Sequence, residues 1–249
     1  MDRFLYLSMA GAKQTQQLQK VTSNNLANIN TPGFKRDQAI FSTYLSEEDA
    51  SLNKTRIYSK FDQTVTDFSS ANLNQTGNPL DVSIKGDGFL SLIGMNDQEA
   101  YTRTASLGVN EVGLLVDEQG REILSDQGQP IEIPRSESIS IGKDGTVSFV
   151  PAGGVAADLQ VAARIKLVNP NLNDVVKSED GLFKMKTNVE APLDQGTEIA
   201  SGVLESSNVS AAAEMVNLIE ASRLYEFQIK MMSVAKEISN DETQLGRLS

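Results

Sequence analysis

Residues 23–35 read SNNLANINTPGFK, a run of amides that closes an amphipathic N-terminal segment and then stops sharply. Asparagine is a poor helix former, because its side-chain amide competes for nearby backbone groups, so four asparagines in seven residues need an explanation. Proline disfavours a helical conformation at the residue before it, and Pro32-Gly33 is typical of a turn. The amides either end a fraying helix or lie in a packed seam, where they fix register and partner.

Residues 3–30 are predicted to form a helix with an interrupted apolar face. Apolar side chains recur at spacings of three and four at both ends of the segment, but residues 14–17 leave a polar gap. A lone helix of this kind is marginal in water, because it can bury little apolar area. We therefore expect it to need a partner helix.

A second helix of about 30 residues is predicted near the C-terminus, with Asn208 or Ser210 as its cap and Gly246 as its end. Two neighbouring apolar rows step by three and four, which indicates a wide apolar stripe with heptad character. The first row is Met215, Leu218, Ser222, Tyr225, Ile229 and Met232, and the second is Leu224, Phe227, Met231, Val234 and Ile238.

Between the helices the period of the pattern changes to two, which indicates strands. Residues 80–85 are expected to return as residues 89–93 across a glycine turn, residues 139–141 as residues 147–149, and residues 159–168 to form a further strand. Short strands at this spacing favour an all-β domain of the sandwich or barrel-like kind.

The sequence thus predicts an α+β fold, in which an all-β central domain is inserted between N- and C-terminal helices that pair as a coiled-coil-like unit. Opposite charge favours this pairing, because residues 1–36 contain five bases and one acid while residues 205–249 contain seven acids and four bases. The expected domains are 1–36 with 205–249 as a helical assembly domain, 37–76 as an extended arm with two short strands, and 77–204 as the β-rich domain.

The composition excludes several kinds of function. The 249 residues contain no Cys and no His, so a Cys/His or Ser/His nucleophile and a thiolate metal site are impossible. A net charge of −11 argues against a nucleic-acid binder. Asp81 and Asp87 flank a glycine turn, where acids usually form turns, and no metal or phosphate motif is present. We expect no enzyme activity, no cofactor and no membrane insertion, and the first residues show no cleavable signal.

Three separated motifs carry a family resemblance: residues 1–35, residues 76–116 and residues 202–226. Their order is similar to that of the flagellar basal-body rod and hook family of axial proteins, and the opening residues 1–14 are most similar to its proximal-rod members. Ala105 and Leu107 depart from the glycine and phenylalanine common in relatives. The resemblance covers nearly the whole chain.

The resemblance implies a structural subunit of the proximal rod, the drive shaft that crosses the periplasm. It implies helical assembly with itself and other rod subunits, and passage through the flagellar export apparatus without a cleaved leader. We expect the assembly interface to include Asn24, Asn25, Leu26, Asn28, Pro32, Gly33, Phe34, Met215, Leu218, Tyr225, Ile229 and Met232.

Three alternatives stay open at this point. A distal-rod or hook subunit would share the same motifs. A carboxylate-dependent hydrolase of cell-wall glycan needs no histidine, although no acid pair stands out. A soluble coiled-coil adaptor would explain the C-terminal helix alone.

Overall fold

The computed structural model describes residues 2–45, 57–94, 97–154, 158–178, 180–187 and 189–245. The chain forms two compact units. The helix unit comprises Met1–Ile29, Arg36–Asp67 and Val209–Ser249, and the sheet unit comprises Asn30–Lys35 and Phe68–Asn208. The chain therefore passes between the units four times, and each unit is described by itself.

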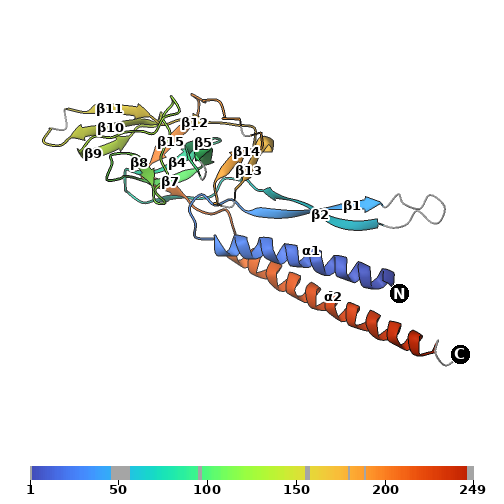
Figure 1. The fold of residues 1–249 in the computed structure, drawn as a ribbon. Helices are drawn as coiled ribbons and strands as arrows, with labels where there is room; N and C mark the ends of the chain where they lie inside the picture. The colour runs from blue at the N-terminus through green and yellow to red at the C-terminus, as the bar shows by residue number, and fades with distance from the viewer. Residues whose placement is uncertain are drawn as a thin grey trace. The chain divides into compact units, whose positions relative to one another are not determined.

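The helix unit contains the two predicted helices, α1 (Asp2–Ala27) and α2 (Ala211–Leu245). They lie side by side and run in opposite directions (Figure 1). The helical prediction is confirmed at both ends of the chain, and α2 is somewhat longer than expected at 35 residues. Gly246, the expected end of the second helix, lies outside the described residues.

A long hairpin completes the helix unit. Strand β1 (Asp37–Leu45) pairs antiparallel with β2 (Ile57–Thr66), with a register shift between Ile40 and Phe41. The rings of Phe41 and Phe61 pack edge to face with centroids 6.0 Å apart, and the hairpin lies along α1 (Figure 1). The region expected to be an arm with two short strands thus forms strands of nine and ten residues.

The sheet unit is built from short strands and includes the 3₁₀ turn η2 (Leu172–Asp174). Its strands are β3 (Leu73–Gln75), β4 (Asp81–Lys85), β5 (Phe89–Ile93), β6 (Glu99–Thr102), β7 (Thr104–Val109), β8 (Leu115–Asp117), β9 (Ser136–Ile141), β10 (Thr146–Pro151), β11 (Gln160–Arg164), β12 (Leu167–Val168), β13 (Val175–Lys177), β14 (Phe183–Met185), β15 (Glu198–Ser201) and β16 (Val203–Glu205).

These strands form open sheets in the orders β12-β5-β6-β14-β13, β15-β4-β7-β8, β11-β10-β9 and β16-β3. The mostly β central region confirms the α+β class, but none of the sheets formed by the described strands closes on itself. The barrel-like form of the prediction is therefore not found.

Two strand predictions were wrong in their pairing. Strands β4 and β5 exist, but they do not form a hairpin, because Gly86–Gly88 carries the chain from one sheet to another. Gly88 has φ +122°, and a Cβ there would lie 2.7 Å from the Thr197 hydroxyl, so the crossing needs glycine. The strand predicted at residues 159–168 divides into β11 and β12, which join different sheets.

One large apolar core lies inside the sheet unit, and a smaller aromatic cluster lies beside it. The large core draws buried Val, Ile and Leu side chains from β4, β5, β7, β8 and β10. The smaller cluster packs Phe68, Phe89 and Phe183 with ring centroids 5.2 to 6.0 Å apart. The members of both clusters belong to the sheet unit.

Candidate assembly surface

Small and polar side chains occupy several of the buried positions in the seam where α1 and α2 pack together. On α1 the buried positions include Ser8, Ala12 and Thr15, and on α2 they include Ala221 and Ala235. Such side chains let two helices approach closely, but they bury little apolar area. The close approach is visible at Gly11 of α1, where a Cβ would lie 2.9 Å from the amide of Gln228.

Polar contacts fix the register of this seam. The Gln19 amide donates to the Ser222 hydroxyl at 3.3 Å, and the Ser222 hydroxyl itself donates to the Leu218 carbonyl at 2.8 Å. Gln19 therefore lies level with Ser222, and Gly11 lies level with Gln228. The two pairs define an antiparallel register in the middle of α1.

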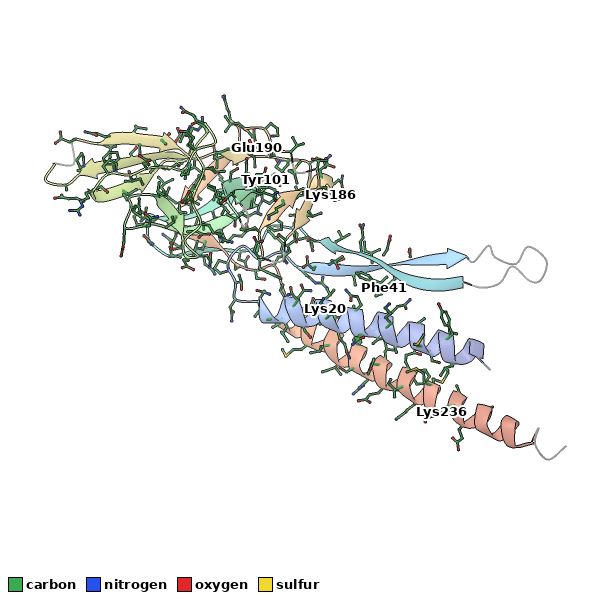
Figure 2. All side chains as sticks on the ribbon, viewed as in Figure 1. Lys20, Phe41, Tyr101, Lys186, Glu190 and Lys236 are labelled. Carbon is green, nitrogen blue, oxygen red and sulfur yellow. The ribbon has the colours of Figure 1, made fainter. Side chains whose placement is uncertain are left out.

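Many large apolar side chains of the two helices are exposed in the single chain. Phe227 is 55% exposed and Leu224 is 52% exposed, although both belong to a row that sequence patterning assigns to a packed interface. Figure 2 shows side chains projecting from both helices, with Lys20 on α1 and Lys236 on α2 labelled. The other large apolar side chains that remain exposed on these helices are Leu5, Tyr6, Leu7, Met9, Met215, Val216, Ile219, Ile229, Val234 and Ile238.

Asn25 is one asparagine of the amide run whose role is visible in the structure. Its side chain is buried, donates to the Asp37 carbonyl at 2.9 Å and accepts from the Asp37 amide at 2.9 Å. The amide thus pairs with the first residue of β1 as a neighbouring strand would. Arg36, one residue earlier, donates to the Glu214 carboxylate of α2 at 2.7 Å. These contacts join α1, the hairpin and α2 at one end of the helix unit.

The other predicted interface residues lie in different places. Asn24 is exposed, Asn28 donates to the Asn24 carbonyl at 2.9 Å, and Leu26 is half-buried. On α2, the half-buried side chains of Leu218, Tyr225 and Met232 share the row of buried Ala221, whereas Met215 and Ile229 are exposed. The structure brings Leu218, Tyr225 and Met232 together along one helix face. Contact of these residues with another subunit stays a prediction.

Pro32, Gly33 and Phe34 belong to the sheet unit, where Pro32 is exposed and the other two are buried. Gly33 has φ +72°, and its amide donates to the Glu205 carbonyl at 2.8 Å. The Lys177 ammonium lies 3.4 Å from the centroid of the Phe34 ring and donates to the Lys35 carbonyl at 2.7 Å. A cation over an aromatic face is attractive, so β13 holds this loop in place.

A buried ion cluster, which we call the Glu205 clamp, lies beside this loop. It consists of Lys35, Arg103 and Glu205, whose side chains are 0%, 5% and 2% exposed. The Lys35 ammonium donates to Glu205 Oε1 at 2.8 Å, and Arg103 Nε donates to Glu205 Oε2 at 2.9 Å.

The clamp also binds the backbone near residue 70, just after the chain re-enters the sheet unit at Phe68. The Ala71 amide donates to Glu205 Oε1 at 2.9 Å, and the Lys35 ammonium donates to the Ser69 carbonyl at 2.7 Å. Asn208 completes the contact, because its side-chain amide donates to the Ser69 carbonyl at 3.3 Å. One carboxylate thus ties together the chain at residues 35, 71, 103 and 205.

Two opposing effects set the pKa of Glu205. Burial raises the pKa of this carboxyl group. Hydrogen bonds from the Ala71 amide, Lys35 and Arg103 lower the pKa by more than burial raises it, so the pKa lies below the ordinary value. Glu205 is therefore ionised at neutral pH. Its negative charge partly compensates the two buried cations, which is the condition for a buried ion cluster to be tolerated.

Sequence reasoning did not select the members of the clamp as site residues. Lys35, Arg103 and Glu205 each fall inside one of the three family motifs, so the motifs were the signal that could have found them. What the motifs did not carry was the information that these three residues, up to 170 positions apart, meet in space.

The remaining polar clusters are structural in geometry. Asp81 is buried and accepts from Asn78 and Ser106, whereas Asp87 is exposed, so the two acids do not share a cleft. In another polar cluster, the Lys166 ammonium donates to the Glu99 carboxylate at 2.8 Å. Burial raises the pKa of the Tyr101 hydroxyl to about 12. Tyr101 and Glu190 are labelled in Figure 2.

Within the described part of the chain, no group of three or more His, Cys, Asp or Glu residues is placed to hold a metal ion. Among the helices in that part, none is both long and apolar enough to cross a membrane.

Comparison with known proteins identifies three matching domains. Residues 5–35 match the domain described as "Flagella basal body rod protein", residues 83–149 match "Flagellar hook protein FlgE/F/G D1 domain", and residues 200–245 match "Flagellar basal body rod FlgEFG protein C-terminal". The Glu205 clamp draws one residue from each of the three matches.

Whole-chain relatives agree with the domain matches. The chain is 34% identical to the flagellar basal-body rod protein FlgF of Escherichia coli strain K12 and to that of Salmonella typhimurium, with all of each chain covered. It is 32% identical to the flagellar basal-body rod protein FlgG of Bacillus subtilis strain 168, over 99% of this chain and 100% of the relative.

Proposed function

The chain belongs to the flagellar basal-body rod protein family, and from this membership we propose how its helices build the rod. It is a structural subunit of the rod. The observation that carries the proposal is the distribution of side chains in the helix unit, where small and polar groups occupy several buried positions and twelve large apolar side chains of the described helix residues are exposed.

The energetic argument favours contacts between subunits. Fully burying a side chain such as Leu or Phe contributes about 1.5–3 kcal/mol. Val216, Leu224, Phe227 and Val234 are about half exposed in the single chain, so burying the remainder would contribute several kcal/mol in total. Exposed apolar rows of this kind typically mark interaction sites, and the expected occupant is a terminal helix of a neighbouring rod subunit.

The finer features of the function are part of the same proposal. Within each subunit α1 and α2 pair in a coiled-coil-like manner, and copies associate through heterologous contacts that do not close, which generates a helical shaft. Partners are other copies and other rod subunits. The chain reaches the periplasmic part of the basal body through the flagellar export apparatus, without a cleaved signal.

A place in the proximal rod is favoured over the distal rod or hook. The FlgF proteins of two enterobacteria cover the whole chain at 34% identity, and the FlgG protein of Bacillus subtilis follows at 32%. A difference this small leaves a distal-rod subunit as the second candidate. The cell-wall hydrolase receives no support from any of these relatives, and the acids Asp81 and Asp87 do not form a catalytic pair.

Replacing Ile229 with Asp tests the proposal. Ile229 is 42% exposed in the single chain, so the isolated protein should fold normally, whereas burial of an unpaired charge at a subunit contact should prevent incorporation. Leu218→Asp should also prevent incorporation while leaving the sheet unit folded. The measurements are motility in soft agar, the amount of protein in purified basal bodies and near-ultraviolet circular dichroism of the isolated chain.

Lys230→Asp is the matched control, since it places the same side chain at the neighbouring exposed position without removing an apolar group. We expect it to retain more incorporation than Ile229→Asp. Normal swimming by both the Leu218→Asp and the Ile229→Asp strains would overturn the proposal, as would absence of the wild-type protein from basal bodies.

A further inference from the structure

Two rows of mostly exposed side chains on the helix unit complement each other in charge and apolar character. On α2 one row lies one residue before the seam positions and consists of Ala213, Val216, Glu220, Leu224, Phe227, Met231, Val234 and Ile238. All of them are exposed except Met231, which is half-buried. Its steps of three and four keep it on one face of the helix, as in a heptad repeat. Glu220 is the sole charged member of this row.

The complementary row on α1 follows each seam position by one residue. It consists of Leu5, Met9, Lys13, Gln16 and Lys20, all of them exposed. Between Leu5 and Ile29 the charged residues are Lys13 and Lys20, and the sequence has no acid there. The α1 row therefore offers apolar groups at one end and positive charge further along, whereas the α2 row offers apolar groups around one negative charge.

The helical geometry places the two rows on opposite sides of the helix pair. One residue rotates an α-helix by about 100°, so each row lies roughly a quarter turn from the seam. Because α1 and α2 are antiparallel, a step forward on one and a step backward on the other rotate in the same sense. The α1 row and the α2 row thus face away from each other, and one chain cannot join them.

The register within one chain leads to the same conclusion. Gln19 lies level with Ser222 and Gly11 with Gln228, so Lys13 lies level with about residue 226, some six residues beyond Glu220 along α2. In the described part of the chain, no ion pair involves Lys13, Lys20 or Glu220. Their complementarity can be satisfied between copies.

We propose that the α2 row receives the α1 row of a second copy of this chain, antiparallel, with Lys13 opposite Glu220. This inference rests on the proposed function and names the partner at the same surface. The register places Met9 opposite Leu224 and Leu5 near Phe227, so apolar groups meet on one side of the ion pair. Since the two rows lie on opposite sides of the helix pair, the contact is heterologous and propagates along a filament.

Charge reversal tests the pairing. Glu220→Lys alone and Lys13→Glu alone should each reduce the swimming halo and the amount of this protein in purified basal bodies, because each places like charges opposite one another. The double variant Lys13→Glu with Glu220→Lys should restore both. Lys20→Glu with Glu220→Lys is the matched control, with the same charges two helical turns away, and should not restore them. Rescue by the control pair, or no rescue by the Lys13 pair, would overturn the register.

Cysteine cross-linking provides a readout that does not depend on motility. The natural chain has no cysteine, so Lys13→Cys with Glu220→Cys introduces the sole two thiols. A disulfide requires Cα atoms within about 7 Å, a distance that two helices in contact allow. Mild oxidation of purified basal bodies should give dimers and higher multimers of this chain, and the Lys20→Cys with Glu220→Cys pair should give fewer.

The outcomes separate the two proposals. Basal bodies that contain the cysteine variant but give no multimers of it, or give a cross-link to a different protein, would refute the pairing while leaving the rod function intact. Basal bodies that lack even the wild-type chain would refute the proposed function itself.

Discussion

Replacing Glu205 with Gln should strongly destabilise the sheet unit. The substitution keeps the shape of the side chain but removes the charge that Lys35 and Arg103 share, and all three side chains are at most 5% exposed. Breaking a buried ion cluster from one side typically costs about 3–5 kcal/mol, because it leaves uncompensated buried charge. We expect a loss in this range, since two cations lose their partner.

The assay is urea unfolding of the full chain at pH 7, followed by near-ultraviolet circular dichroism of the buried Tyr101. Glu198→Gln is the matched control, because Glu198 pairs with Lys85 at 3.5 Å and both side chains are more than half exposed. Exposed pairs of this kind contribute about 0–1 kcal/mol. A Glu205→Gln variant within 1 kcal/mol of the wild type would refute the reasoning.

The same variant predicts a pH dependence. The folded-state pKa of Glu205 is below its ordinary value of 4.5, so the native state is stabilised by ionisation above that value. The stability difference between the wild type and Glu205→Gln should therefore be fully present at neutral pH and shrink as the pH falls below about 4.5. Unfolding curves between pH 3 and 7, on the order of one per pH unit, measure this. A difference that stays constant over the range would contradict the ionised clamp.

Two further substitutions test how the amide-rich stretch is held. Asn25→Ala removes both hydrogen bonds between the buried Asn25 amide and the Asp37 backbone, so we expect a loss of about 2 kcal/mol in the helix unit and faster hydrogen exchange at the Asp37 amide. Unchanged exchange at that amide would contradict the anchoring role. Gly33→Ala combines a left-handed backbone with a Cβ 2.7 Å from Thr104 Cγ2, whereas Gly77→Ala has a similar φ of +78° and open space around it. Gly77→Ala is the control and should show the backbone cost alone, about 1–2 kcal/mol. Equal losses of stability in the two variants would show that the Thr104 contact does not matter.

The sequence predicted the elements well where one local period decides them. The steps of three and four in the C-terminal segment give α2, and the alternation at residues 80–85 gives β4. Local pattern could not predict which row of α2 faces α1, since both rows have the same period. The structure places the small residues inward, because Ala12 and Ala221 allow an approach that Leu224 or Phe227 would block.

Long-range pairing was the part that the sequence did not determine. A glycine between two strands permits a hairpin as readily as a crossing between sheets, so the pairing of β4 with β15 and β7 depends on the whole core. The Glu205 clamp is a stronger example. Lys35 and Glu205 are far apart in the chain, and no periodicity relates a buried lysine to the carboxylate that compensates it. The amide run was interpreted as a frayed end or a seam, yet Asn25 pairs with the first residue of β1.

The two units differ in what stabilises them, and this difference bears on assembly. The sheet unit has its own apolar core and a buried ion cluster, so its stability should not depend on protein concentration. The helix unit buries mainly small groups in its seam and leaves Phe227 and Leu224 half exposed. A partner that binds the folded form stabilises it by mass action, so the helix unit should gain stability on assembly and the sheet unit should gain little. Under the proposed function, such a subunit would bring a folded sheet unit to the rod and complete the packing of its helices there, against its neighbours.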